Sequence, residues 1–215
     1  MLNRTLFALL LLFLSFNASA QQASAPREGV DYVTLSQAQP TESAGKIEVT
    51  EFFWYRCPHC YSLEPVLDPW TKKLARDAQF RRVPAIFNAE WALDGRIFFA
   101  LEVTGDLERV HRKLFDAIHT GGGVRLKGDA YVKWVADWLG RNGVDPAKYD
   151  AAYRSFSVDA KLKRAAQLTQ AYRIEGVPAI AVGGRWIATA SRENTTMLRV
   201  VDYLIGEARK RSAKK

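Results

Sequence analysis

The stretch KIEVTEFFWYRCPHC, residues 46–60, decides the expected fold of this chain. Its first ten residues place apolar side chains on both faces toward Tyr55, which is the pattern of an interior strand covered on both sides. Cys57 follows two residues later, and a helical pattern then runs to about residue 76. A Cys-x-x-Cys that opens a helix directly after a buried strand indicates a redox site.

The rest of the chain extends this unit in both directions. Further strands are predicted at residues 32–35, 80–87, 179–182 and 185–189, and a last helix at 193–207. Helical patterns fill the middle, at residues 97–103, 107–118, 130–139, 146–153 and 158–172. The order predicts an α/β protein with a thioredoxin fold, residues 21–90 and 173–215, interrupted by an all-helical insertion, residues 91–172.

The first twenty residues have the parts of a secretory signal peptide. Arg4 precedes an apolar run from Leu6 to Phe16, and the small residues ASA at 18–20 suit signal peptidase. An uncleaved membrane anchor is the alternative, but about eleven apolar residues fall short of the roughly 20 that a transmembrane helix needs. We therefore expect cleavage after Ala20 and a mature chain that begins at Gln21.

Composition narrows the classes of function. The 215 residues are 48% hydrophobic and 25% charged, which is typical of a globular domain. There are 31 basic and 23 acidic residues, an excess of positive charge that often indicates a nucleic-acid partner. An exported protein would not meet nucleic acid, so the remaining partners for this charge are acidic unfolded chains or anionic membrane surfaces, with a modest attraction. Disulfides persist in the oxidising space outside the membrane, so the two cysteines of the sequence are candidates for a disulfide there.

Cys57 and Cys60 are predicted to be a redox pair. Their spacing brings both sulfurs to one helical face, and the N–H groups at the helix start favour the Cys57 thiolate. Cys60, one turn further in, is expected to be the buried member. Haem attachment would need a His where Tyr61 stands, and a metal site would need further ligands from among the three histidines of the chain, His59, His111 or His119. A purely structural bridge across two residues would constrain little chain entropy.

Neighbouring residues are expected to tune this pair. His59, when protonated, would stabilise a thiolate and make the disulfide a stronger oxidant. Arg56 is either a second cation beside Cys57 or a solvated residue. Glu51 shares the parity of apolar residues in its strand, six residues before Cys57. It is either a buried acid that moves protons to and from Cys60 or a glutamate at a solvated strand edge.

Three residues outside the motif are predicted from the sequence alone to have ordinary structural positions. Pro178 begins a predicted strand after Gly176-Val177, where an ordinary trans proline is expected. His111 and His119 lie in charged helical segments and are expected at the surface.

Two parts of the sequence resemble one known family. Residues 51–61, with Cys-Pro-His-Cys at their centre, and the downstream GVPA at 176–179 are similar to the periplasmic thiol:disulfide interchange proteins of the DsbA family. The resemblance covers nearly the whole mature chain. Arg56 departs from it, since family members often carry an aromatic residue or Gly there. The basic partner of the buried acid stays open between Arg81 and Arg82.

The resemblance implies a role for each site residue. Cys57 is the exposed nucleophile, Cys60 its buried partner, and Glu51 the acid beneath them. A cis Pro178 packs against the disulfide, and Val177 offers its backbone to an extended substrate peptide, a mode of binding that tolerates many sequences.

The predicted function is disulfide oxidation in the periplasm. A thiolate of an unfolded or reduced exported protein attacks Cys57, and a second one resolves the mixed disulfide. The resemblance implies that His59 tunes the reduction potential and that a membrane quinone-linked thiol oxidase restores the disulfide. No cofactor, metal or nucleic acid is expected, and the chain is expected to be a monomer. The alternatives are a disulfide isomerase or reductase, which usually needs a dimerisation module, and a peptide-binding chaperone in which the Cys-x-x-Cys is incidental.

Overall fold

The computed structural model describes residues 25–189 and 194–213, and in that part the strands form one mixed sheet. The strands are β1 (Tyr32–Thr34), β2 (Ile47–Phe53), β3 (Ala78–Pro84), β4 (Ala179–Val182) and β5 (Trp186–Thr189). Their order is β1-β5-β4-β2-β3, with β2 and β3 parallel and the other neighbours antiparallel. The strand that leads into the Cys-x-x-Cys, β2, is therefore an interior strand.

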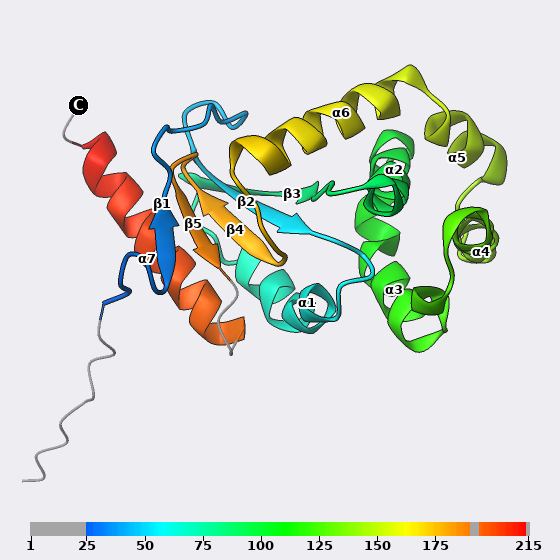
Figure 1. Cartoon of the computed structure of the whole chain (residues 1–215), viewed down its shortest axis with the longest axis horizontal. Coiled ribbons are helices and arrows are strands. Elements are labelled where there is room, and N and C mark those ends of the chain that lie inside the picture. The colour runs from blue at the N-terminus through cyan, green and yellow to red at the C-terminus, as the bar shows by residue number, and fades with distance from the viewer. Residues whose placement is uncertain (1–24, 190–193, 214–215) are drawn as a thin grey trace, which may run out of the picture.

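Helices cover the sheet and build a separate block at one end of it (Figure 1). Their bounds are α1 (Pro58–Thr71), α2 (Ala89–Thr104), α3 (Leu107–Thr120), α4 (Gly128–Arg141), α5 (Pro146–Tyr153), α6 (Phe156–Ala171) and α7 (Asn194–Ser212). Helices α2 to α5 gather beyond the end of β2 that leads to α1, and α6 runs back from them toward the sheet (Figure 1). The helix-rich block thus faces the point where the Cys-x-x-Cys begins.

Hydrophobic side chains fill both faces of the sheet. On one face Val49 packs in a cluster with Leu63 of α1 and Leu204 of α7. On the other face Phe52 lies in the cluster shared with the helical block, and its ring centre is 5.2 Å from that of Tyr172. All of β2 after its first residue is buried, as an interior strand covered on both sides requires.

The predicted fold is confirmed: the sheet has the expected strands, and the inserted helices lie between β3 and β4. Some predicted bounds were wrong. Helix α2 starts eight residues earlier than expected because the Asn88 side chain caps it by accepting hydrogen bonds from the N–H groups of Glu90 and Trp91. Helix α1 ends at Thr71, and β3 ends at Pro84.

The expected signal peptide, residues 1–20, lies outside the described residues, as does the expected start of the last helix at residue 193. Among the helices that are described, none combines the length and the apolar character needed to cross a membrane.

Candidate active site

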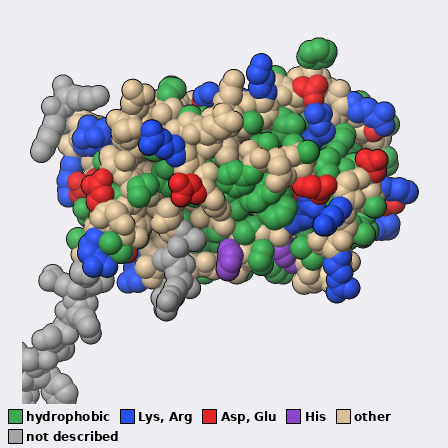
Figure 2. Space-filling view, in the orientation of Figure 1, with side chains coloured by type: hydrophobic (Ala, Val, Ile, Leu, Met, Phe, Trp, Pro, Cys, Tyr) green, Lys and Arg blue, Asp and Glu red, His purple; other side chains and the backbone are tan. Residues whose placement is uncertain are grey.

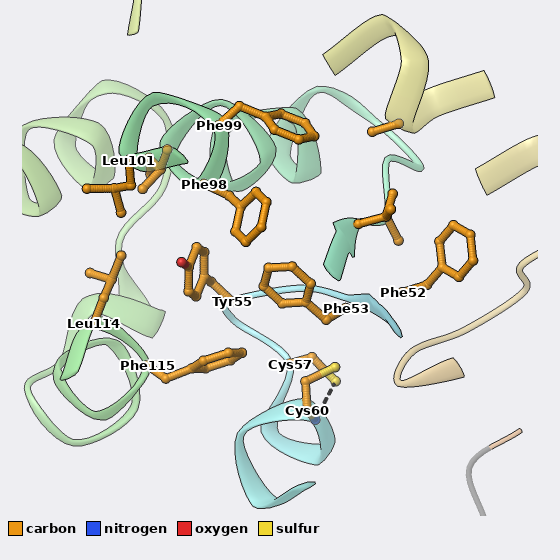
Figure 3. Close-up of a cluster of buried hydrophobic side chains, with 14 of the residues drawn as sticks. Phe52, Phe53, Tyr55, Cys57, Cys60, Phe98, Phe99, Leu101, Leu114 and Phe115 are labelled. Atoms are coloured by element: carbon orange, nitrogen blue, oxygen red, sulfur yellow. Dashed lines mark hydrogen bonds between the residues drawn. The ribbon is translucent and has the colours of Figure 1, made fainter. Parts of the chain in front are cut away.

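Cys57 occupies the N-cap of α1, where its extended backbone turns into the helix. Its N–H donates to the Trp54 carbonyl at 3.0 Å, and Pro58, which has no N–H to leave unsatisfied, takes the first helical position. The two cysteines are not joined in a disulfide, and the Cys57 sulfur accepts a hydrogen bond from the Cys60 N–H at 3.5 Å (Figure 3). The helix start therefore directs a backbone dipole at the Cys57 sulfur.

The two thiols differ strongly in acidity. Hydrogen bonding from the Cys60 side chain, then from the N–H groups of Cys60 and His59, outweighs burial and lowers the pKa of Cys57 to about 6; the His59 charge acts in the same direction. Burial raises the pKa of Cys60 well above its ordinary value, and Cys57 and Glu51 add to this rise. At neutral pH the site holds a thiolate at Cys57 beside a thiol at Cys60.

The exposed side of the site is formed by the middle of the motif and by a second segment. Pro58 and His59 are exposed, whereas Val177 is half-buried and Pro178 is buried. Cys57 itself is only 7% exposed, so the exposed position that the resemblance implied for it was wrong. The Val177–Pro178 peptide is cis, as the family resemblance implied and in contrast to the trans proline favoured by the sequence alone. The Val177 carbonyl accepts a hydrogen bond from the Cys57 sulfur at 3.5 Å. This contact joins the two sequence segments, more than a hundred residues apart, that carried the family resemblance.

A cavity of about 570 Å³ opens beside this second segment. Apolar side chains from β1, β5 and the segment before β4 contribute to its lining, among them Leu35, Tyr172, Ile174, Val177, Pro178 and Ile187. Figure 2 shows hydrophobic side chains gathered in the middle of one face of the molecule, with histidine side chains near their margin. The volume and the apolar lining suit a peptide side chain or another apolar group.

Glu51 lies fully buried beneath the pair, not at a solvated strand edge. The register of β2 and β3 sets Arg82 directly beside it, and the Arg82 Nε lies 3.1 Å from a Glu51 carboxylate oxygen. The same guanidinium reaches Glu64 of α1 at 3.2 Å. Arg81 points to the opposite side of β3 and pairs with Glu42 at 2.9 Å. Strand alternation therefore makes Arg82 the partner of the buried acid.

Two carboxylates thus share one guanidinium, and they differ in protonation. Burial, only partly offset by Arg82 and reinforced by Glu64, raises the pKa of Glu51 to about 8. Burial would also raise the pKa of Glu64, but His111 and Arg82 outweigh it, so that this pKa is lowered. At neutral pH the proton resides on Glu51, and Glu64 is the ionised partner of Arg82.

The loop before Cys57, residues 54–56, is held by the helical block. Trp54 Nε1 and Arg56 Nε both donate to one oxygen of Asp94, at 2.7 and 3.0 Å, and the Tyr131 hydroxyl donates to the other oxygen. Arg56 also pairs with Glu90 at 3.1 Å, and its guanidinium lies over the rings of Trp54 and Tyr131. Arg56 is buried and turned into the block, so neither predicted placement for it, beside Cys57 or in solvent, was right.

Two histidines of α3 hold the remaining residue of this loop. The Tyr55 hydroxyl lies 2.8 Å from His111 Nδ1, and the Tyr55 carbonyl lies 2.9 Å from His119 Nε2. His111 is 6% exposed, so its predicted surface position was wrong. His119 is half-buried and stacks on Tyr61, with ring centres 4.4 Å apart. Both face inward because they share the apolar side of α3 with Leu114 and its buried neighbours.

The sequence analysis missed three residues that surround the site. Glu64 could have been found, because it follows Cys60 by four residues and so shares the buried face of α1. Asp94 and Tyr131 lie far away in sequence, and no local pattern marks them. In the part of the chain that the structure describes, no group of three or more His, Cys, Asp or Glu is arranged to hold a metal ion.

Comparison with known proteins gives a consistent result. The family model described as "DSBA-like thioredoxin domain" matches residues 70–200. The thiol:disulfide interchange protein DsbA of Pseudomonas aeruginosa is 39% identical over 218 residues that span both chains completely. The protein of that name from Azotobacter vinelandii is 42% identical over 185 residues, which are 84% of each chain.

Solved structures agree with the sequence relatives. The crystal structure of Pseudomonas aeruginosa DsbA superposes with a TM-score of 0.80 at 37% identity, covering 91% of this chain and 99% of that one. The oxidoreductase DsbA from Xylella fastidiosa gives a TM-score of 0.79 at 33% identity, covering 87% of this chain and all of that one.

Proposed function

The chain belongs to the DsbA family and is a thiol:disulfide oxidoreductase, and we propose that it donates a Cys57–Cys60 disulfide to reduced proteins that have been exported. The observation that carries the direction of the reaction is the unequal acidity of the two thiols. A thiolate at Cys57 that is stable at neutral pH stabilises the reduced pair, and this makes the disulfide a strong oxidant.

The proposed reaction has two exchange steps. A substrate thiolate attacks the Cys57 sulfur, the bond between the two cysteines breaks, and a mixed disulfide forms. The departing Cys60 sulfur takes up a proton, and we assign the protonated Glu51 as its source. A second substrate thiolate then attacks the substrate sulfur and releases Cys57 as a thiolate. The substrate loses two electrons to the cysteine pair and gains a disulfide.

The remaining site residues have supporting roles in this proposal. His59, exposed between the cysteines, adds positive charge that favours the thiolate of Cys57. Val177 and Pro178 offer main chain and an apolar surface to an extended substrate, and the cavity beside them would take one of its side chains. Recognition of main chain explains how one site could serve many unfolded sequences.

We also infer the setting in which the chain works. The family is periplasmic, and the signal peptide predicted at residues 1–20 supports that location for this chain. Its partners would be unfolded or reduced exported proteins and a membrane quinone-linked thiol oxidase that takes up the electrons. The division into a thioredoxin-like part, residues 21–90 and 173–215, and a helical insertion, residues 91–172, remains a proposal.

The test is the reduction potential of the pair, measured by equilibration with glutathione. The known potential of a DsbA is about −120 mV, and a value near it is the expected result, whereas a value near the −270 mV of thioredoxin would identify a reductase. Cys57→Ser and Cys60→Ser should each abolish oxidation of a reduced model protein, because neither variant can hold the disulfide that accepts the substrate's two electrons. A Cys57→Ser variant that still suppresses aggregation as well as the unmodified chain would instead favour the chaperone alternative.

A further inference from the structure

The buried polar cluster beneath the cysteines continues into the helical block. His111 of α3 places its Nε2 3.6 Å from a Glu64 oxygen, and its Nδ1 contacts the hydroxyl of Tyr55. A chain of polar contacts therefore runs from Glu51 on β2 through Arg82 on β3 and Glu64 on α1 to His111, with successive distances of 3.1, 3.2 and 3.6 Å. Four elements contribute one group each.

The contacts of His111 determine where its proton lies. Burial raises the pKa of Tyr55 well above its ordinary value, so the phenol keeps its proton. The Tyr55 hydroxyl therefore donates a hydrogen bond to Nδ1 of His111. Burial lowers the pKa of His111, and Arg82 acts in the same direction, against the attraction of Glu64. The imidazole is therefore neutral, and because Nδ1 accepts from the Tyr55 hydroxyl, its proton lies on Nε2. Among the described residues Nε2 makes no hydrogen bond, and it lies 3.6 Å from a Glu64 oxygen, within ion-pair distance.

Few charged or titratable groups other than Glu64 act on His111. The charged or titratable groups that act on it come from the segment after β2 (Tyr55), from α1 (Glu64), from β3 (Arg82) and from α3 itself (Glu108). Its other contacts are aromatic rings, those of Phe53, Phe98 and Phe115. Within the described residues, Glu64 is the carboxylate that lies within ion-pair distance of this imidazole.

We propose that His111 is a positioning residue of the redox site: its Nε2–H, at ion-pair distance from Glu64, favours the ionised form of Glu64 as the partner of Arg82, so that Arg82 is shared and Glu51 keeps its proton. This inference rests on the proposed function, in which Glu51 supplies the proton to Cys60. A histidine of the helical insertion thereby sets the protonation of Glu51, which lies in the sheet.

Loss of the imidazole has a defined consequence for the cysteines. Glu64 would bind a proton more readily, and Arg82 would then pair with Glu51 alone. Glu51 would ionise at lower pH, and its negative charge beneath the pair would repel the thiolate of Cys57. The reduced form would become less stable relative to the disulfide form, so the protein would become a weaker oxidant.

The experiment compares three variants of the full-length mature protein. His111→Phe keeps a ring among the aromatic neighbours but has no Nε2–H, His111→Gln retains a donor, and Phe115→Leu loosens the same cluster without removing a polar group. We expect His111→Phe to shift the glutathione equilibrium toward the protein disulfide by about threefold to tenfold, since one pKa unit corresponds to a factor of ten. The ionisation midpoint of Cys57 should rise with it, and His111→Gln should return part of both shifts.

Two outcomes overturn the inference. One is a His111→Phe variant with the glutathione equilibrium and Cys57 ionisation of the unmodified chain, and the other is a Phe115→Leu variant that shifts both as much. If His111→Phe does not fold, Tyr55→Phe gives the same test, because it removes the phenol that fixes the proton on Nε2, and an unshifted equilibrium there overturns the inference as well. Failure of the unmodified chain to exchange disulfides with glutathione would instead refute the proposed function.

Discussion

Asp94→Asn is the substitution that best tests how the helical block holds the loop before Cys57, residues 54–56. Asp94 is 1% exposed and accepts hydrogen bonds from Trp54, Arg56 and Tyr131. The substitution keeps the shape of the side chain and one acceptor oxygen, but it removes the negative charge. The Arg56 guanidinium, which is 5% exposed, then loses its buried counter-charge.

The expected loss follows from these contacts. Breaking a buried ion pair by removing one partner costs about 3–5 kcal/mol, because the other charge stays buried and uncompensated. Glu90, which is 45% exposed, still compensates part of the Arg56 charge, and the amide oxygen can still accept one of the hydrogen bonds. We therefore expect the free energy of unfolding to fall by about 3 kcal/mol, at the lower end of that range.

The assay is chemical denaturation of the reduced protein, with a matched control on the same block. Asp159→Asn removes the carboxylate that pairs with Arg96 at 2.6 Å, but Asp159 is 51% exposed, so the expected loss is below about 1 kcal/mol. Arg56→Met combined with Asp94→Asn should cost less than the two single losses added together. Equal losses for Asp94→Asn and Asp159→Asn, or strict additivity with Arg56→Met, would refute the reasoning.

Two further predictions concern the thiol and the backbone. The pKa of Cys57 is lowered in the fold to about 6, so the stability that its ionisation gives the reduced protein is complete above the unfolded pKa of roughly 8.5 and is lost as the pH falls through 6. Thiolate absorbance at 240 nm should therefore titrate near pH 6, and a midpoint above 8 would contradict the assignment. Gly184→Ala should destabilise the protein by more than about 1 kcal/mol, since φ is +65° and an added Cβ would clash with the Gln39 carbonyl oxygen. Gly206→Ala, in the open interior of α7, should stabilise it by about 0.5–1 kcal/mol, and thermal unfolding that ranks the two the other way would contradict both assignments.

Much of the site could be predicted because its parts are local in sequence. The position of Cys57 at a helix start and the burial of Cys60 follow from spacing and from the strand before them. The parity of Glu51 marked it as a buried acid, although the solvated alternative remained open. The choice between Arg81 and Arg82 needed the register of β2 and β3, because alternation assigns each arginine to a face only when the pairing is known.

Groups that reach the site from the helical block could not be predicted. Asp94 looks like any acid of a helix until Trp54 and Arg56 are placed against it. His111 was assigned to the surface because its helix is rich in charge, but amphipathic packing puts one face of such a helix inside. Tertiary contacts decide these positions, and a single sequence does not contain them.

Arg56 shows how the two kinds of information combine. The family resemblance led us to expect a departure at this position, and the sequence raises the question of a cation beside Cys57. The structure turns its guanidinium toward Asp94 and Glu90, and the causes that lower the pKa of Cys57 are hydrogen bonds from its own helix turn and the charge of His59. A buried arginine needs its acids in place, so Arg56 couples the position of the loop before Cys57 to the helical block, while the acidity of Cys57 is set by the turn that carries it.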